Sequence, residues 1–303
     1  MKTRLFVLLI LLTTQFCLAQ QDGIVKSSDS SPIYYKTFGA GEPLLIINGG
    51  PGMNSEGFEG LARTLSKNNL TIIYDQRGTG KSAILKPDAS NITMKLMMDD
   101  MESLRKHLNI EKWSILGHSF GGMIASYYAT QYPDRIEKII LSSSGGVDLG
   151  LFSDGGALIN SRLSKSELDS MNYWSEKISA GDKSYRAMMG RARNLAPAYV
   201  YDRKNIPVIA ERLTQGNNTV NQLMWENLQA IKFDCAEALK TFRQPVLIIQ
   251  GRQDILKPEV AEKSHKAFSN SKLIFLEHCG HYGWLDNEDV YFKEIAQFLS
   301  SKK

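Results

Sequence analysis

Short apolar runs alternate with amphipathic stretches along most of the chain. Continuous runs rich in Val, Ile and Leu are typical of strands that are covered on both faces of a sheet. We predict strands at residues 43–47, 70–74, 136–141, 245–250 and 272–276, and a further short strand that ends at Leu116. Residues 33–38 alternate and stop at Gly39-Ala40-Gly41, which predicts an early edge strand followed by a turn.

Amphipathic segments separate the predicted strands. In residues 94–108 the apolar side chains recur at helical spacing and form one stripe. Further helices are predicted at residues 56–66, 258–268 and 287–299, and from Ser119 to a stop at Pro133. Strands and helices that alternate at these lengths imply right-handed crossovers and a mostly parallel sheet flanked by helices, which is an α/β fold.

The rhythm changes between residues 147 and 239. This stretch has few β-branched runs, many polar and aromatic residues, and helical periodicity around residues 165–179, 184–193 and 219–232. We therefore predict one α/β core made of residues 20–146 and 240–303. Residues 147–239 are predicted to be inserted as a helical cap over the carboxyl edge of the sheet.

The first 19 residues differ from the rest. A basic start, the apolar run 5–12 and the small Ala19 are typical of a secretory signal peptide, residues 1–19, cleaved after Ala19. The alternative is a buried first helix. The apolar run is too short for a permanent membrane span. We therefore expect a secreted protein, or a periplasmic one if the source is a Gram-negative bacterium.

Charge and cysteine content exclude several classes of function. The 303-residue chain has a net charge of +4, or +2 without residues 1–19, and no basic stripe, so no nucleic-acid partner is expected. Cys235 and Cys279 lie far apart, and Cys279 sits in the loop of a candidate catalytic histidine, so we expect no disulfide between them. Neither their spacing nor the nearby histidines indicate a metal site, and we expect no cofactor.

The segment Gly117-His118-Ser119-Phe120-Gly121 has the form of a nucleophile elbow. Such an elbow presents a serine at a sharp turn between a strand and a helix, and the flanking glycines let the two elements approach closely. The pattern Gly-x-Ser-x-Gly also occurs by chance in ordinary strand-to-helix turns. The predicted strand before it and helix after it favour Ser119 as a nucleophile.

Asp254 and His281 each follow a predicted strand, as Ser119 does. In a parallel sheet these positions meet at one edge, where an imidazole can activate the serine and a carboxylate can orient the imidazole. The other candidates are less well placed, since two histidines lie in helices and one precedes the nucleophile. They are His107, His118, His265 and His278 for the base, and Asp75 and Asp148 for the acid. We expect Asp75 and Arg77 to form a structural pair after their strand.

An acyl-transfer site also needs hydrogen-bond donors for the developing oxyanion. The backbone N–H of Phe120, at the start of the predicted helix, is one candidate. The second candidate is the N–H of Gly50, in the glycine-rich loop that follows the strand at residues 43–47. The alternative for this loop is a simple Gly/Pro turn.

Together these segments resemble the α/β-hydrolase fold, and most of all the prolyl aminopeptidase-like serine peptidases. The resemblance is carried by Gly-Gly-Pro-Gly at 49–52, Asp-Gln-Arg-Gly-x-Gly-x-Ser at 75–82, the elbow at Ser119, Asp254, and Gly280-His281. Two positions depart from the family pattern. Asn48 stands where the family usually has His, and the elbow reads Gly-His-Ser-Phe-Gly, a form shared with esterases.

The resemblance implies a cap residue that binds the substrate's free amino group. Trp225-Glu226 is similar in placement to the family's amine-binding Glu, and the alternative is a surface Glu beside a core Trp. Aromatic residues could line an apolar pocket or simply pack the cap; they are Phe120, Tyr173, Trp174, Tyr199 and Tyr201.

The sequence thus predicts a serine hydrolase that acts on a small peptide or ester. The leading hypothesis is an exported aminopeptidase that releases proline or other N-terminal residues through an acyl-enzyme. A carboxylesterase with the same triad is the alternative, and a non-catalytic binding protein on the same fold is the third. Ser119 argues against epoxide hydrolase and dehalogenase chemistry, because those relatives carry Asp there.

Overall fold

The computed structural model describes residues 20–150 and 155–301 of the chain. Within these residues, one eight-stranded sheet has the order β1-β2-β4-β3-β5-β6-β7-β8. Its strands are β1 (Gln21–Lys26), β2 (Pro32–Phe38), β3 (Glu42–Ile47), β4 (Asn69–Tyr74), β5 (Trp113–His118), β6 (Ile136–Ser142), β7 (Val246–Gly251) and β8 (Ser271–Leu276). β2 pairs antiparallel with both β1 and β4, and every other neighbouring pair is parallel.

The central strands are buried on both faces, as their apolar sequences require. Successive side chains of a strand point to opposite faces. Leu45 and Ile47 accordingly belong to one hydrophobic cluster, and Leu44 and Ile46 belong to the other. The sheet therefore lies between two separate hydrophobic layers, and its strand ends are the natural place for polar chemistry.

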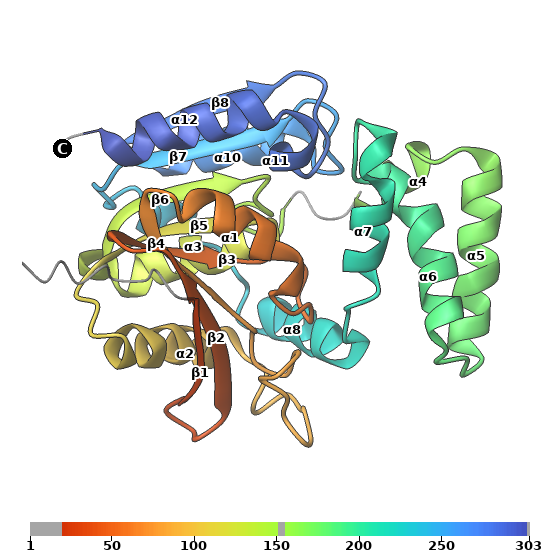
Figure 1. Cartoon of the computed structure of the whole chain (residues 1–303), viewed down its shortest axis with the longest axis horizontal. Helices are drawn as coiled ribbons and strands as arrows, with labels where there is room; N and C mark the ends of the chain where they lie inside the picture. Colours follow the sequence, from red (N-terminus) through yellow and green to blue (C-terminus); the bar gives the residue numbers. More distant parts are fainter. Residues whose placement is uncertain (1–19, 151–154, 302–303) are drawn as a thin grey trace, which may run out of the picture.

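Helices of the core cover both layers (Figure 1). On the side of Leu45 lie α2 (Met94–His107), α3 (Phe120–Gln131) and α10 (Pro258–Ala267). On the side of Leu44 lie α1 (Glu59–Leu65), α11 (Gly283–Asp286) and α12 (Glu288–Ser300). In α2 the capping residue Thr93 accepts a hydrogen bond from the Leu96 N–H, so the amphipathic helix begins where the sequence predicts.

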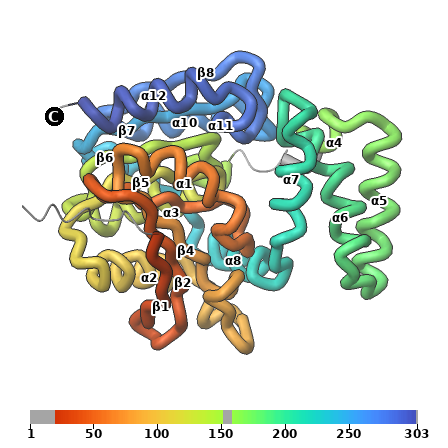
Figure 2. The backbone as a smooth tube through the Cα atoms, viewed as in Figure 1, coloured from red at the N-terminus to blue at the C-terminus, as the bar shows by residue number. Residues whose placement is uncertain are grey.

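The described elements between β6 and β7 are helices. They are α4 (Gly155–Ser161), α5 (Lys165–Ser179), α6 (Tyr185–Leu195), α7 (Ile206–Leu213), α8 (Asn218–Ala230) and α9 (Ala236–Leu239), with short 3-10 turns before α7. We keep the name cap for residues 147–239. Figures 1 and 2 show α4 to α7 beyond one end of the sheet, whereas α8 lies close to α2.

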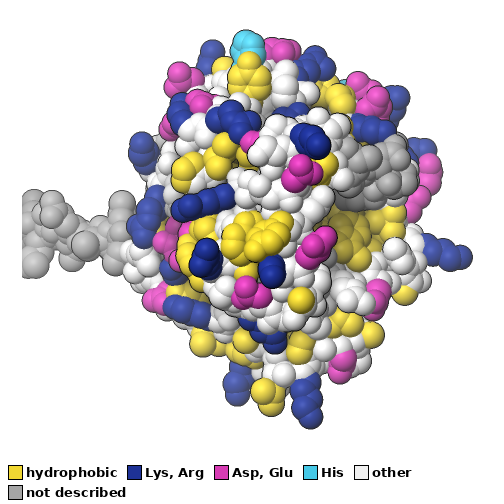
Figure 3. All heavy atoms as spheres, turned by 90° about the vertical axis from the view of Figure 1, so that its right-hand side faces the viewer, with side chains coloured by type: hydrophobic (Ala, Val, Ile, Leu, Met, Phe, Trp, Pro, Cys, Tyr) yellow, Lys and Arg dark blue, Asp and Glu magenta, His cyan; other side chains and the backbone are white. Residues whose placement is uncertain are grey.

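The outer end of the cap carries mixed chemistry. Large apolar side chains are exposed at Tyr173, Tyr185 and Val208. Figure 3 shows hydrophobic side chains near the centre of this end, surrounded by Lys, Arg, Asp and Glu. Inside the cap, Trp174 of α5 fills the space beside Gly190 of α6, where a Cβ atom would lie 2.4 Å from the indole.

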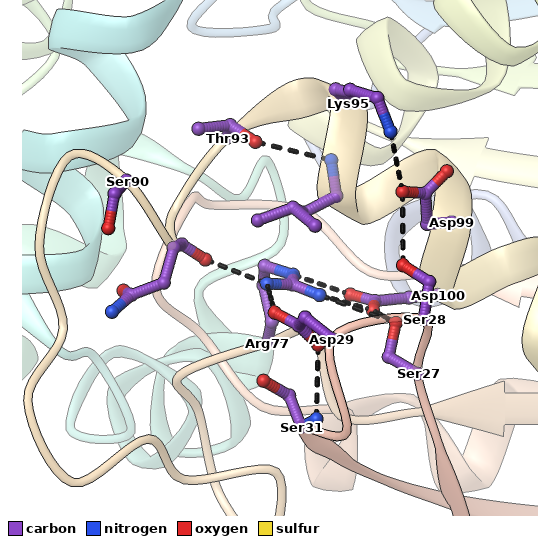
Figure 4. A network of polar contacts seen from close by, with 12 residues as sticks. Ser27, Ser28, Asp29, Ser31, Arg77, Ser90, Thr93, Lys95, Asp99 and Asp100 are labelled. Carbon is purple, nitrogen blue, oxygen red and sulfur yellow. Dashed lines mark hydrogen bonds and ion pairs between the residues drawn. The ribbon is translucent and has the colours of Figure 1, made fainter.

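The expected pair between Asp75 and Arg77 is wrong. Arg77 is fully buried and donates to Asp100 of α2, at 2.6 and 2.8 Å, and to Asp29 at 3.1 Å (Figure 4). Asp75 instead accepts hydrogen bonds from the N–H and hydroxyl of Ser55 and from the Lys81 N–H. Both residues are structural, but Arg77 ties the turn between β1 and β2 to α2.

Two further expectations concern edges and membranes. Residues 32–38 form the second strand and not the edge, because β1, which the pattern did not reveal, lies outside it. In residues 20–150 and 155–301, no helix combines the length and apolar character that a bilayer crossing needs. The predicted signal peptide, residues 1–19, lies outside the described residues.

Candidate active site

Ser119 occupies a sharp turn between β5 and α3. Its backbone has φ 54° and ψ −120°, a conformation that costs a non-glycine residue about 1–3 kcal/mol and persists only where neighbours hold it. The Ser119 N–H donates to the carbonyl of Ser142 at 3.1 Å, and its carbonyl accepts from the N–H groups of Gly122 and Gly145 at 2.9 Å. The turn is thus fixed from both sides.

The glycines of the elbow allow this turn because there is no room for a side chain. A Cβ atom on Gly121 would lie 2.2 Å from the carbonyl oxygen of Ile47, and one on Gly117 would lie 2.4 Å from that of Gly121. Real Cβ atoms do not approach backbone this closely. The start of α3 therefore packs directly on β3, which brings Ser119 to the loop that follows β3.

Asp254 and His281 meet beyond the ends of β7 and β8. The Nδ1 of His281 lies 2.7 Å from the Oδ1 of Asp254, and the Leu256 N–H donates to the same oxygen at 3.1 Å. Both residues are buried: 2% of the surface of His281 and 5% of that of Asp254 is exposed. A carboxylate on Nδ1 fixes the tautomer that leaves Nε2 free to act as a base.

His118 packs against the histidine of this pair. It precedes Ser119, and its ring centre lies 4.6 Å from that of His281. The ring is surrounded by Phe58, Tyr282 and Trp284. Burial lowers the pKa of His118 well below its ordinary value, and the nearby His281 and Arg212 lower it further. His118 therefore packs as a neutral ring beside His281.

The loop of residues 48–52 lies against Ser119. A Cβ atom on Gly49 would lie 2.7 Å from the Ser119 Cβ, so this backbone passes as close to the serine as it can. Gly50 has φ +68° and Gly52 has φ +85°, both in the region that favours glycine. Of the predicted oxyanion donors, the Gly50 N–H belongs to this loop and the Phe120 N–H belongs to the residue after Ser119. Their role stays a prediction.

Cap residues hold the histidine loop, a feature that the sequence did not reveal. The His281 N–H donates to the Tyr199 carbonyl at 2.7 Å, and the Tyr199 ring packs edge-on against the imidazole at 5.6 Å. The Asp286 carboxylate accepts four hydrogen bonds, one from the Gly280 N–H and three from the cap. The cap donors are the N–H groups of Tyr201 and Asp202 and the amide of Asn205.

The other predicted site residues lie elsewhere. Glu226 is exposed on α8 and accepts a hydrogen bond from Gln222 at 2.8 Å, and Trp225 packs against the core. Their substrate role stays a prediction, which these contacts do not favour. Asp148, a rival for the catalytic acid, pairs with Lys263.

The aromatic residues named for the pocket divide between several roles. Tyr199 contacts His281, and Trp174 packs inside the cap. The Tyr201 and His278 rings pack against each other with their centres 5.1 Å apart. Tyr173 is half exposed, and Phe120 is buried beneath the elbow.

The two cysteines outside residues 1–19 are buried. Cys235 and Cys279 are free thiols, as expected, and burial raises the pKa of both. In the part of the chain that the structure describes, no group of three or more His, Cys, Asp or Glu side chains could hold a metal ion.

Comparisons with known proteins identify the fold family. A family model described as the alpha/beta hydrolase fold matches residues 42–288. The chain belongs to the α/β-hydrolase fold family. Its curated relatives include the proline iminopeptidase of Lactobacillus helveticus (strain DPC 4571), 27% identical over 279 residues, which cover 88% of this chain and 93% of the relative. The resemblance to prolyl aminopeptidase-like peptidases is therefore confirmed.

Solved structures of this fold family are similar across almost the whole chain. Proline iminopeptidase from Mycobacterium smegmatis has a TM-score of 0.71 at 20% identity and covers 92% of this chain and 97% of its own. An esterase from Exiguobacterium antarcticum has a TM-score of 0.71 at 19% identity, covering 93% of this chain and 100% of its own. At these identities the structures establish the fold alone.

Proposed function

We propose that this α/β hydrolase is an exported serine aminopeptidase that releases N-terminal residues, proline or others, from short peptides. The observation that carries the serine mechanism is the 2.7 Å contact between His281 Nδ1 and Asp254 Oδ1. Ser119, at φ 54°, directly follows His118, whose ring centre lies 4.6 Å from that of His281. The similarity to curated proline iminopeptidases, at 26–27% identity, supports the interpretation as a peptidase.

In the proposed reaction, Ser119 Oγ attacks the carbonyl carbon of the substrate while His281 Nε2 takes the hydroxyl proton. The negative charge moves to the carbonyl oxygen, where the N–H groups of Gly50 and Phe120 stabilise it. When the tetrahedral intermediate collapses, His281 returns the proton to the leaving amine and an acyl-enzyme remains. A water molecule, deprotonated by His281, then hydrolyses the ester and frees Ser119.

A carboxylesterase is the second candidate. The same steps cleave an ester, with an alcohol as the leaving group. One observation favours it: Glu226, the residue named for amine recognition, is exposed and bonded to Gln222. An aminopeptidase needs a buried acid to hold the substrate ammonium, because an unpaired buried charge costs several kcal/mol.

Export rests on residues 1–19 alone. Their basic start and apolar run support cleavage after Ala19 and a secreted or periplasmic location. Expression in a secreting host, followed by mass measurement of the product, tests this part. A mature chain that begins at Gln20 supports export, and a full-length chain retained in the cytoplasm contradicts it.

A substrate panel separates the two candidates. It pairs aminoacyl arylamides, prolyl arylamide among them, with their N-blocked forms and with simple aryl esters, and it includes the Ser119→Ala variant as a blank. Turnover of the free-amine amides alone supports the aminopeptidase. Fast ester turnover that ignores N-blocking supports the esterase, and no turnover above the blank would favour a binding protein.

A further inference from the structure

Arg212 is a buried cation on the cap helix α7 that reaches the loop after β3. Only 3% of the residue is exposed. Its Nη1 donates to the Asn54 carbonyl at 2.7 Å and to the Gln215 side chain at 3.0 Å, and its Nη2 donates to the Gly49 carbonyl at 3.2 Å. The guanidinium also lies over the Phe58 ring, 5.2 Å from its centre.

The environment of this arginine is unusual for a buried charge. Buried guanidinium groups normally pair with a carboxylate, as Arg77 and Arg105 do here. Among residues 20–150 and 155–301, no carboxylate lies within ion-pair distance of Arg212, and its Nε has no hydrogen-bond partner. Burial lowers the pKa of the group. Besides the Gln215 side chain, its hydrogen-bond acceptors are the backbone carbonyls of Gly49 and Asn54, both in the loop after β3.

The Gly49 carbonyl belongs to the same planar peptide unit as the Gly50 N–H, the proposed oxyanion donor. A charge-assisted hydrogen bond to the carbonyl is stronger than a neutral one and polarises the amide, which makes its N–H a better donor. The Asn48 side chain donates to the same carbonyl at 3.2 Å. Two donors, one of them charged, thus orient this peptide.

We propose that Arg212 is a positioning residue that orients and polarises the Gly49–Gly50 peptide, so that the Gly50 N–H stabilises the oxyanion of the transition state. This inference rests on the proposed serine mechanism. It assigns to the cap a part in the chemistry, because α7 carries the arginine. At the start of α7, the Asn205 side chain donates to the Asp286 carboxylate, which also accepts from the Gly280 N–H. One helix therefore connects the oxyanion loop to the histidine loop.

Two glycines offer a matched test that leaves the charge of Arg212 in place. A Cβ atom on Gly57 would lie 2.4 Å from the Arg212 Cδ, whereas one on Gly60, three residues along the same segment, would meet nothing within 4 Å. Gly57→Ala therefore displaces the arginine and Gly60→Ala does not. Arg212→Lys removes the forked donor directly. Its control is Arg105→Lys, which alters another buried arginine that donates to backbone carbonyls, at Ile110 and Glu111.

The measurements are kcat and KM on the preferred substrate and the affinity for two ketones shaped like it. A trifluoromethyl ketone forms a tetrahedral oxyanion with Ser119, and the methyl ketone does not to a comparable extent. Loss of a whole oxyanion donor costs about 10²- to 10³-fold in kcat, so a weakened donor should cost roughly tenfold. We expect this loss in Arg212→Lys and Gly57→Ala, with the same loss of trifluoromethyl ketone affinity and unchanged KM and methyl ketone affinity.

Gly60→Ala and Arg105→Lys should have the kcat, KM and ketone affinities of the wild type. Wild-type kcat and ketone affinities in folded Gly57→Ala and Arg212→Lys would overturn the inference, and so would an equal loss for both ketones, which would indicate a collapsed pocket. If Arg212→Lys fails to fold, Gly57→Ala decides. A wild-type protein with no turnover and no fluorophosphonate adduct on Ser119 would overturn the proposed function and this inference together.

Discussion

The imidazole rings of His118 and His281 lie 4.6 Å apart, and only His281 contacts a carboxylate, that of Asp254. His118 is held among aromatic rings, where burial lowers its pKa well below 6.5. The histidine that precedes Ser119 is thereby kept neutral beside His281, the proposed base. A second positive charge at this distance would oppose protonation of His281 during the reaction.

The His118 environment predicts how stability depends on pH. Because the folded pKa is lowered, the unfolded chain binds a proton below pH 6.5 that the folded protein does not. His118 therefore does not lower the free energy of unfolding above about pH 6.5. Below that pH the free energy of unfolding falls, by at most about 1.4 kcal/mol per pH unit. Removing the titrating ring should remove this loss.

The measurement is urea unfolding of the wild type and of His118→Phe between pH 5 and 7.5. The difference in unfolding free energy should shift in favour of the variant as the pH falls below 6.5. A difference that stays constant over this range would show that His118 titrates normally in the folded protein.

Asp254→Asn tests the contact to His281. An amide can hold the ring in the wrong tautomer, so we expect kcat to fall by about 10³- to 10⁴-fold while the protein stays folded. Asp148→Asn is the control, because Asp148 lies by Lys263 and should leave kcat unchanged. Steady-state kinetics on one substrate serve both variants, and a small effect for Asp254 with a large one for Asp148 would reverse the assignment.

Gly121→Ala tests the packing of the elbow. The new Cβ would lie 2.2 Å from the Ile47 carbonyl oxygen, so either β3 or α3 must move. We expect a loss of roughly 2–4 kcal/mol in unfolding free energy, or failure to fold, from overpacking at a rigid contact. Gly60→Ala, which meets nothing within 4 Å, should be neutral or slightly stabilising. Equal stability of the two variants would contradict the close approach.

Asp99 and Asp100 are adjacent residues with different surroundings. Asp100 is buried against Arg77, and Asp99 pairs at the surface with Lys95. Asp100→Asn leaves a buried guanidinium without its full partner and should cost about 3–5 kcal/mol, whereas Asp99→Asn should cost under about 1 kcal/mol. Denaturant unfolding of both variants measures the contrast, and similar costs would show that the Arg77 pair contributes little.

The parallel core was predictable because long apolar runs permit little besides buried strands. The runs at 43–47, 70–74 and 272–276 fall within one residue of β3, β4 and β8. β1 was not predicted because it is largely exposed, with Ile24 59% exposed, and therefore has no apolar run. Its antiparallel pairing with β2 holds it in place. The local pattern of apolar and polar residues does not indicate such pairing.

Some residues of the candidate site were predicted from the sequence and others were not. Ser119 was marked by a local motif, and Asp254 and His281 by their place after buried strands, where a parallel sheet collects polar residues. Arg212 and Asp286 carried no signal, because each acts on backbone groups far away in sequence. Arg77 shows the converse, since its nearest acid in sequence, Asp75, is not its partner, and Asp100 on α2 is.

The account depends most directly on Ser119 as the nucleophile. Incubation with a fluorophosphonate, followed by peptide mass spectrometry, measures where a covalent adduct forms. We predict one adduct, on Ser119, which is absent in Ser119→Ala and forms much more slowly in Asp254→Asn. A folded wild-type protein that carries no adduct, or carries it on another residue, would contradict the proposed mechanism.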